Sequence, residues 1–302
     1  MKKQVTVTIG IPAFNESANI EALLRSLVVQ KTKRVSLTKI IVVSDGSTDE
    51  TVSQARNVKD LRISIVGRPT RLGHCLTQNE ILEHVQSDYL ILMDADVLPK
   101  DDLMVENLLT PFFKDSSITL VGGNTESLLP QTLVESFLTA SHNFKQRLYQ
   151  DINHGDNIYL CHGRIRALHR ALYQNLRWPN HTPEDSYLYL INKKHSGKFS
   201  FCKNATVAFR CPQTLLEHKL QSTRFLQGKK RLVELFGLPA VKKAYHIPKF
   251  LFVRHFLVYL LTNPVTGLGY VGMMLFIRLN RIEKSAYRAT FKIAKTSKRI
   301  VL

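Results

Sequence analysis

Two carboxylates, Asp94 and Asp96, stand one residue apart directly after the apolar run Tyr89–Met93. Such a run predicts a strand buried on both faces, and its end would project into the crevice where open α/β sheets bind ligands. Hard cations such as Mg²⁺ and Mn²⁺ take oxygen ligands and are usually completed by substrate phosphates. The spacing therefore fits a divalent-metal site that also holds a diphosphate. Two acids at a strand-to-loop transition before Pro99 are also an ordinary structural feature.

Two more polar turns lie upstream, each after a predicted strand. The first strand covers residues 5–11 and leads to Asn15 and Glu16, and the second covers residues 39–44 and leads to Asp45. Asn15 is expected to cap a helix over about residues 18–30. Ser47 and Glu50 fit the spacing of a capping box, which predicts a helix after the second turn.

Residues 62–66 and 73–85 predict a further strand and helix. Alternating strands and helices over about 110 residues indicate a doubly wound, mostly parallel sheet. Because the carboxyl ends of parallel strands meet at one edge, Glu16, Asp45 and Asp94 are expected to face one crevice.

The ordered motifs resemble those of family 2 glycosyltransferases with the GT-A fold. The matching segments are Ile-Pro-Ala-Phe-Asn-Glu at 11–16, Val-Val-Ser-Asp-Gly-Ser-Thr-Asp-Glu-Thr at 42–51, residues 71–79, Asp-Ala-Asp at 94–96, residues 161–170, Thr-Pro-Glu-Asp at 182–185 and Gln-Ser-Thr-Arg-Phe at 221–225. The likeness covers residues 5 to about 225, which predicts a catalytic domain at 1–225 and a basic helical region at 226–302. Gly73-His74 stands where the family usually has Gly-Lys, and Phe225 where Trp follows the arginine.

The resemblance implies a role for each matched residue. The nucleotide sugar would be bound by Pro12, Phe14, Glu16, Asp45, Arg71, Asp94 and Arg224, and Mg²⁺ or Mn²⁺ by Asp94 and Asp96. The acceptor side would comprise His162, Gly163, Glu184, Gln221 and Phe225, with Asp185 as the general base. A single base and a single displacement imply inversion at the anomeric carbon.

Some of these residues have a simpler structural explanation. Asp185 and Glu184 precede an apolar run and are also typical of the acidic first turn of a helix. Gln221 and Arg224 are three residues apart, so they share one helical face, which could be an exposed polar one.

Length and composition favour a globular enzyme. The 302 residues are 44% hydrophobic, which suits one domain of about 220 residues and an appendage. Met1 is followed by two lysines and a predicted strand rather than by the apolar core of a secretory signal. The four cysteines show no Cys-x-x-Cys spacing, so we expect a reducing cytosolic setting without structural zinc.

The positive charge is concentrated in the C-terminal part. Residues 1–185 hold 20 Lys and Arg against 21 Asp and Glu, whereas residues 186–302 hold 22 against 3. Two apolar arms, at 250–261 and 265–277, are interrupted at Asn263-Pro264. Each arm is too short to cross a bilayer, and a single crossing would place the basic tail outside.

These features predict a peripheral, monotopic or re-entrant hairpin on the anionic cytoplasmic face of the membrane, with Arg254 and His255 at the interface. The alternative is a pair of helices packed on the catalytic domain. The proposed donor residues, from Asp45 to Arg224, are expected to lie before a cut at about Pro248, and the two apolar arms after it.

The sequence favours a metal-dependent, inverting transferase that moves a sugar from a nucleotide diphosphate sugar, a UDP-sugar by the resemblance, to a glycan or lipid-linked acceptor. Two other classes stay open. The basic tail is compatible with a nucleic-acid-binding protein, although it lacks a nucleic-acid motif and no nucleic-acid partner is expected. A catalytically idle scaffold with the same fold is the third class.

Overall fold

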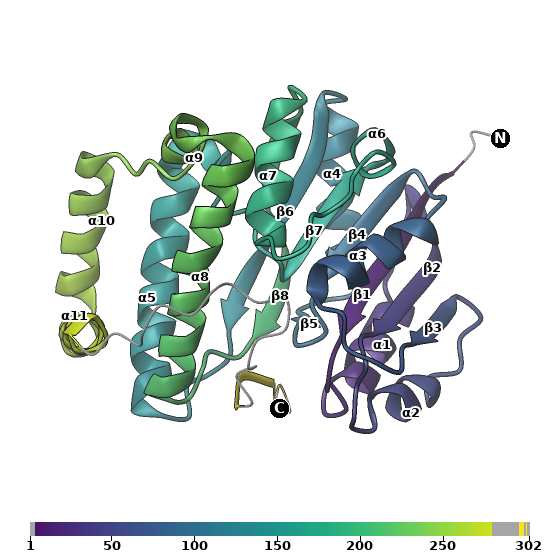
Figure 1. Ribbon diagram of the computed structural model, residues 1–302, viewed down its shortest axis with the longest axis horizontal. Coiled ribbons are helices and arrows are strands. Elements are labelled where there is room, and N and C mark those ends of the chain that lie inside the picture. The colour runs from purple at the N-terminus through teal and green to yellow at the C-terminus, as the bar shows by residue number, and fades with distance from the viewer. Residues whose placement is uncertain (1–3, 280–295, 299, 301–302) are drawn as a thin grey trace.

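The computed structural model describes residues 4–279, 296–298 and 300 (Figure 1). An eight-stranded sheet forms its centre, in the order β3-β2-β1-β4-β7-β6-β8-β5. The strands are β1 (Val5–Ala13), β2 (Val35–Ser44), β3 (Ile63–Gly67), β4 (Tyr89–Met93), β5 (Leu98–Pro99), β6 (Ile118–Ser127), β7 (Ile165–His169) and β8 (Lys198–Phe209). The helices of the first 210 residues are α1 (Ile20–Val28), α2 (Thr51–Arg56), α3 (His74–Glu83), α4 (Met104–Lys114), α5 (Leu133–Asp151), α6 (Arg170–Tyr173) and α7 (Glu184–Lys194).

Parallel pairing brings the ends of three strands together. β3, β2, β1 and β4 are mutually parallel, while β7 runs antiparallel to both β4 and β6. Ala13 pairs with Ser44, so Phe14 and Asp45 leave the sheet at the same edge, and Asp94 leaves it there from β4. The predicted mixed α/β, mostly parallel architecture is confirmed. The antiparallel strand β7 lies between the parallel strands β3-β2-β1-β4 and the parallel pair β6-β8.

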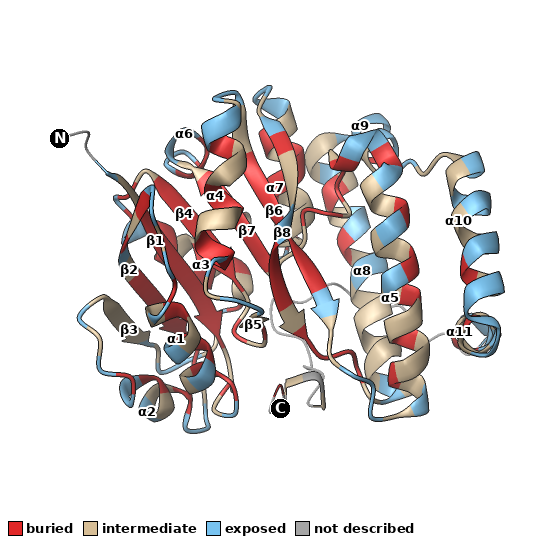
Figure 2. Ribbon diagram, turned by 180° about the vertical axis from the view of Figure 1, so that it is seen from behind, coloured by how far each residue is buried: buried red, intermediate tan, exposed pale blue. Residues whose placement is uncertain are grey.

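Hydrophobic clusters cover both faces of the sheet, whose strands are the most buried part of the molecule (Figure 2). On β4, Ile91 and Met93 belong to one cluster, and Leu90 and Leu92 belong to the other. This alternation follows from the two-residue period of a strand. The predicted strand at Tyr89–Met93 is therefore confirmed in its bounds and in its burial on both faces.

The two predicted helix caps are wrong. α1 begins at Ile20 after Asn19, and α2 begins at Thr51 after Glu50, and neither preceding side chain forms a capping hydrogen bond. Asn15 instead adopts a left-handed conformation (φ 53°), and its Oδ1 accepts from the Thr48 backbone N–H at 2.8 Å. Ser47 Oγ accepts from the Asn15 N–H at 3.1 Å. Both side chains thus join the two loops to each other, because a neighbouring loop satisfies them better than the local helix.

The C-terminal part is helical. It comprises α8 (Leu215–Phe236), α9 (Leu238–Ala244), α10 (Lys249–Thr262) and α11 (Pro264–Leu279), followed by a short turn, η2 (Thr296–Lys298). α10 and α11 correspond to the two arms of the predicted hairpin, with the interruption at Asn263, and both pack against α5. Figure 1 shows α10 from the side and α11 end-on, so the two arms lie crosswise rather than antiparallel. The expected domain boundary at residue 225 falls inside α8. Within the described ranges, no helix combines the length and hydropathy needed to cross a membrane.

One close contact between sheet and helix gives a test of the fold. A Cβ on Gly10 would overlap Ile81 Cγ2, a fully buried branch on α3, whereas a Cβ on Gly272 would meet no atom within 4 Å. Gly10→Ala should therefore lower the free energy of unfolding by roughly 1–3 kcal/mol through overpacking. Gly272→Ala, the matched control, should be neutral or stabilise its helix by up to about 1 kcal/mol. Equal urea midpoints for Gly10→Ala and the wild type would contradict this close packing.

Candidate active site

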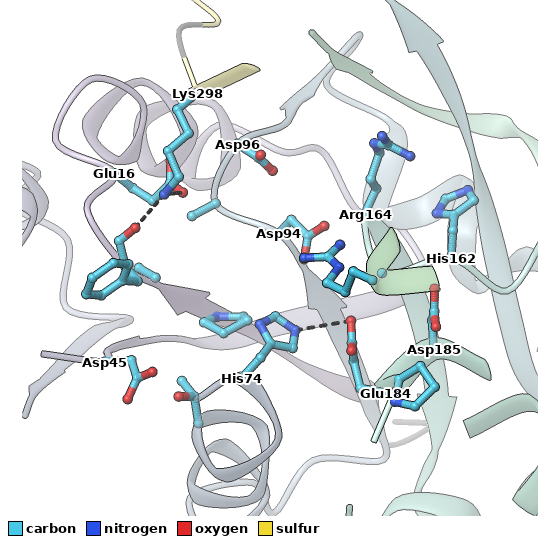
Figure 3. Close-up of a pocket in the computed structure, with 18 of the residues that line it drawn as sticks. Glu16, Asp45, His74, Asp94, Asp96, His162, Arg164, Glu184, Asp185 and Lys298 are labelled. Carbon is cyan, nitrogen blue, oxygen red and sulfur yellow. Dashed lines mark hydrogen bonds and ion pairs between the residues drawn. The ribbon is translucent and has the colours of Figure 1, made fainter. Parts of the chain in front are cut away.

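A pocket of about 270 Å³ lies at the carboxyl edge of the sheet (Figure 3). The structure brings all the site residues expected from the sequence to its lining. These are Pro12, Phe14, Glu16, Asp45, Arg71, Asp94, Asp96, His162, Gly163, Glu184, Asp185, Gln221, Arg224 and Phe225. Their individual roles stay predictions. Parallel pairing of β1, β2 and β4 brings the residues that follow these strands together, and α7 and α8 add theirs from the other side.

Asp45 organises the side of the pocket formed by β1 and β2. Its carboxylate accepts hydrogen bonds from the backbone N–H groups of Leu72 and Gly73, both at 2.8 Å, and from Arg68 at 3.2 Å. Gly46 has a φ of 67°, and a Cβ there would lie 2.5 Å from the backbone nitrogen of Arg71. The close approach and the positive φ both require glycine.

Phe14 and Arg71 form one wall of this side. The Arg71 guanidinium carbon lies 3.9 Å from the centre of the Phe14 ring, a cation–π arrangement. The aromatic face and the planar cation are surfaces on which a nucleoside base and a phosphate can bind.

Asp94 and Asp96 follow β4 and line the centre of the pocket. Burial and the neighbouring Asp94 carboxylate raise the pKa of Asp96, while Arg164 and Lys298 partly offset them. A divalent cation would relieve this repulsion, so the two carboxylates fit a metal. Among the described residues, no three His, Cys, Asp or Glu side chains are grouped closely enough to hold an ion.

Glu184 and Asp185 begin α7 on the opposite side of the pocket (Figure 3). Burial acts to raise the pKa of Glu184, but His74, whose Nε2 is 3.5 Å from Glu184 Oε1, and Arg166 hold it below its usual value. Burial and the Glu184 carboxylate raise the pKa of Asp185 to about 6. Asp185 Oδ1 accepts from the Ser186 N–H at 2.6 Å. Glu184 is thus kept ionised, whereas Asp185 titrates near pH 6.

Gly163 links the two groups of carboxylates. A Cβ on this residue would lie 3.3 Å from Glu184 Oε1 and 3.5 Å from Asp94 Oδ2. Both acidic groups therefore border the same small space. The adjacent His162 is neutral, because burial and the nearby Arg164 lower its pKa to about 3.

Helix α8 closes the pocket with Gln221, Arg224 and Phe225. Its Gly228 allows the helix to approach the turn before α7, since a Cβ there would lie 3.1 Å from Pro183 Cγ. Arg224 also helps to lower the pKa of Glu184. The spacing of Gln221 and Arg224 places both on the helix face that borders the pocket rather than on an outer polar face.

Sequence reasoning missed three cations that act on this pocket. Arg164 and Lys298 line it, and Arg166 is fully buried beneath Glu184 and Asp185, donating through Nη2 to Gln78 Oε1 at 3.1 Å. Lys298 comes from the C-terminal region, beyond the expected catalytic domain at 1–225, and it lines the same pocket. Its sequence context, a run of basic residues, indicated an exposed surface. Arg164 and Arg166 stand in the family motif around Gly163, and this position in the motif was the signal that could have identified them as site residues.

Comparison with known proteins establishes the class. Residues 8–177 match the family described as Glycosyl transferase family 2, and the chain belongs to this family. An uncharacterised glycosyltransferase of Haemophilus influenzae is 27% identical over 120 residues, covering 39% of this chain and 46% of that protein. The chain spans less than half the length of the curated relatives that it matches.

Solved structures agree on the fold. A mannosyltransferase from Pyrobaculum calidifontis, in complex with GDP-Man and Mn²⁺, matches with a TM-score of 0.59 and 17% identity over 93% of this chain and 77% of that one. Glucosyl-3-phosphoglycerate synthase from Mycobacterium tuberculosis, in complex with Mn²⁺, UDP and phosphoglyceric acid, matches with a TM-score of 0.55 and 19% identity over 76% and 78% of the two chains. The chain therefore has the GT-A glycosyltransferase fold.

Proposed function

We propose that this glycosyltransferase moves a sugar, with inversion, from a nucleotide diphosphate sugar to a hydroxyl group of a lipid-linked or glycan acceptor. UDP is the proposed nucleotide, and Mg²⁺ or Mn²⁺ the proposed cofactor. The observation that carries the proposal is that Asp94 and Glu184, which begin the two opposed acidic groups, both face the position of Gly163. The metal-containing complexes of two proteins with the same fold support the choice of cofactor.

Different residues of the pocket would bind the nucleoside, the metal with the diphosphate, and the acceptor. Phe14, Asp45 and Arg71 would hold the nucleoside, while Asp94 and Asp96 would bind the metal and, with Arg224, the diphosphate. When bound, the metal neutralises negative charge on the departing diphosphate. Glu184 would orient the acceptor.

In the transfer step, the acceptor oxygen forms a bond to the anomeric carbon as the bond from that carbon to the diphosphate oxygen breaks. Asp185 takes the proton of the acceptor hydroxyl, and the electron pair leaves with the diphosphate. The single displacement inverts the anomeric carbon.

The hairpin α10–α11 is the proposed membrane contact. One side packs on α5, where Tyr259, Met273 and Ile277 are buried and His255 pairs with Asp151 at 2.8 Å. His255 therefore faces the catalytic domain, while Arg254 is exposed.

Apolar side chains also stay exposed on these helices, among them Phe250, Phe252, Val253, Leu257, Leu261, Val265, Leu268, Phe276 and Leu279. With the positive charge of the C-terminal region, they fit peripheral association with the anionic cytoplasmic face. A lipid-linked acceptor and transfer of single sugars accord with this placement.

Thermal unfolding with UDP-glucose, UDP-galactose and GDP-mannose, each with and without Mn²⁺, tests the donor. A donor at 100 times its Kd should add about 2.7 kcal/mol to the free energy of unfolding, and we expect this only with UDP-sugars and metal. Proton NMR of a product made from the accepted donor would then show the inverted anomer. Stabilisation by GDP-mannose alone would contradict the assignment of UDP, and a retained anomer would contradict the single displacement.

Asp96→Asn should abolish transfer and leave the fold intact, because it removes one ionised ligand from a site with few protein ligands. Chelation of metal from the wild type should have the same effect. Asp102→Asn, on a surface carboxylate that pairs with Lys31, is the control and should keep wild-type activity. The assay is the release of UDP at several Mn²⁺ concentrations. Full activity of Asp96→Asn in metal-free buffer would sink the metal-dependent mechanism.

Asp185→Asn should reduce kcat by roughly 10²- to 10⁴-fold and leave donor affinity unchanged, since its role begins with the acceptor hydroxyl. A base acts in its ionised form, so wild-type kcat should fall as the pH drops through about 6, where Asp185 becomes protonated. Initial rates between pH 5 and 8 and donor titrations measure both effects. Loss of donor binding with kcat preserved would place Asp185 in the donor pocket instead.

Substituting two exposed leucines of the hairpin tests membrane association. The double variant Leu261→Glu with Leu268→Glu should no longer sediment with vesicles containing phosphatidylglycerol, because charges replace the inserted side chains. Leu61→Glu, at an exposed leucine remote from the hairpin, is the control. High salt should release the wild type only partly. A wild type that stays in the supernatant in low salt would refute the proposal. Substitution is preferable to truncation, which would also remove Lys298 from the pocket.

A further inference from the structure

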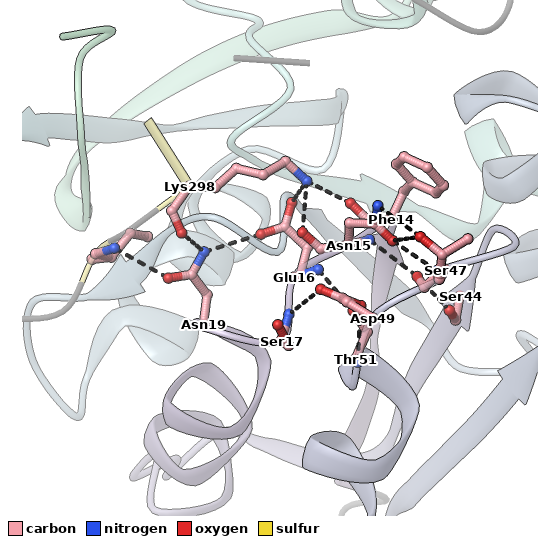
Figure 4. Close-up of polar contacts among 12 residues, drawn as sticks. Phe14, Asn15, Glu16, Ser17, Asn19, Ser44, Ser47, Asp49, Thr51 and Lys298 are labelled. Carbon is pink, nitrogen blue, oxygen red and sulfur yellow. Dashed lines mark hydrogen bonds and ion pairs between the residues drawn. The ribbon is translucent and has the colours of Figure 1, made fainter. Parts of the chain in front are cut away.

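Lys298 reaches from the C-terminal region into the donor side of the pocket (Figure 4). Its ammonium group donates to the backbone carbonyls of Phe14 and Asn15, the latter at 3.1 Å, and forms an ion pair with Glu16. The ammonium has three N–H donors, and these contacts supply three acceptors. The lysine thus binds three consecutive residues of the loop between β1 and α1.

The backbone around Lys298 is held at two further points. Asn19 Nδ2 donates to the Lys298 carbonyl, and Asn19 Oδ1 accepts from the N–H of Ile300, whose side chain is buried. At the other end, the Thr296 N–H donates to Glu217 Oε1, and Thr296 Oγ1 accepts from the Gln213 N–H, both at 3.1 Å.

These contacts connect two parts of the pocket. Gln213 and Glu217 lie at the start of α8, the helix that carries Arg224, whereas Asn19 lies at the start of α1. Residues 296, 298 and 300 therefore connect the start of α8 with the start of α1.

We propose that Lys298 is a positioning residue for donor binding, which fixes the loop 14–16 in the conformation that forms the nucleoside wall. The inference rests on the proposed function of this pocket. Asn15 in this loop has a φ of 53°, which is uncommon for residues other than glycine although Asn adopts it more readily than most. Lys298 adds to the hydrogen bonds that already join Asn15 to Ser47 and Thr48. Two successive carbonyls directed at one point also repel each other unless a cation lies between them.

The wall depends on this loop through Phe14. The ring of Phe14 stacks against Arg71, and Arg71 directly precedes Leu72 and Gly73, whose backbone N–H groups Asp45 holds by hydrogen bonds. A displacement of the Phe14 backbone would therefore disturb the contacts expected for the base. The ammonium also offsets negative charge next to Asp96, where the diphosphate would bring more.

Lys298→Met and Lys298→Arg test the inference in the full-length chain. The methionine variant should bind UDP with Mn²⁺ at least about tenfold more weakly in titration calorimetry and should raise the donor KM by a similar factor. Its kcat at saturating donor should stay within about twofold of the wild type, because Lys298 does not contact the reacting atoms. The arginine variant, which keeps the charge and the donors, should recover most of the affinity.

Lys198→Met is the matched control, since it removes an exposed lysine–carboxylate pair with Asp115 (3.1 Å) outside the pocket. It should leave UDP affinity and donor KM unchanged. If Lys298→Met does not fold, Thr296→Val carries the test, because it loosens the segment at α8 without touching the ammonium. A raised donor KM with unchanged kcat then supports the inference, and an unchanged KM overturns it.

The outcomes separate this inference from the proposed function. A wild type that binds UDP with Mn²⁺ and a Lys298→Met variant that binds it equally well overturn the role of Lys298 alone. A wild type that binds neither UDP nor GDP overturns both. A Lys298→Met variant with normal KM and reduced kcat would also contradict a positioning role.

Discussion

The concentration of negative charge at one edge of the sheet is the constraint on which the rest of the structure depends. Parallel pairing of β1, β2 and β4 brings Glu16, Asp45, Asp94 and Asp96 into one pocket, and α7 adds Glu184 and Asp185 from the other side. Carboxylates this close raise each other's pKa unless cations compensate for them. Burial and Asp96 raise the pKa of Glu16 to about 7 even with the Lys298 ammonium beside it.

Asp45 is compensated by Arg68, which follows β3, whereas the cations that act on the other carboxylates come from later elements of the chain. Arg164 and Arg166 lie at the start of the antiparallel strand β7, Arg224 lies on α8, and Lys298 lies near the end of the chain. Arg164 and Lys298 both lower the pKa of Asp96, Arg166 and Arg224 both lower that of Glu184, and Arg166 also acts on Asp185. The acidic groups are thus differentiated: Glu184 stays ionised, Asp185 titrates near 6, and Asp94 and Asp96 keep the repulsion that a divalent cation can relieve. Different environments for similar carboxyl groups are what a base and a metal site require.

Helix α5 has a comparable organising role for the C-terminal region. Phe144 on α5 packs against Phe252, Phe256 and Tyr259 of α10, and a Cβ on Gly269 of α11 would overlap the Phe137 ring. The hairpin is therefore part of the folded unit, and yet its outer side stays apolar. Packing on the catalytic domain uses the buried side of these two helices, and the proposed membrane contact would use their exposed apolar side chains, so the two alternatives that the sequence presents do not exclude each other.

The sequence by itself determined the features that depend on local periodicity. The bounds of β4, the hairpin break at Asn263 and the order of strands and helices follow from apolar runs and from proline, and the shared edge of Glu16, Asp45 and Asp94 follows from parallel pairing. Tertiary structure alone decided where long-range partners lie. Asn15 and Ser47 bind across two loops instead of capping helices, because a hydrogen-bonding side chain takes whichever partner the fold presents. Arg166 is buried and Lys298 reaches Glu16 across 282 residues of sequence. Such contacts form only when folding has brought distant segments together, and no local pattern records them.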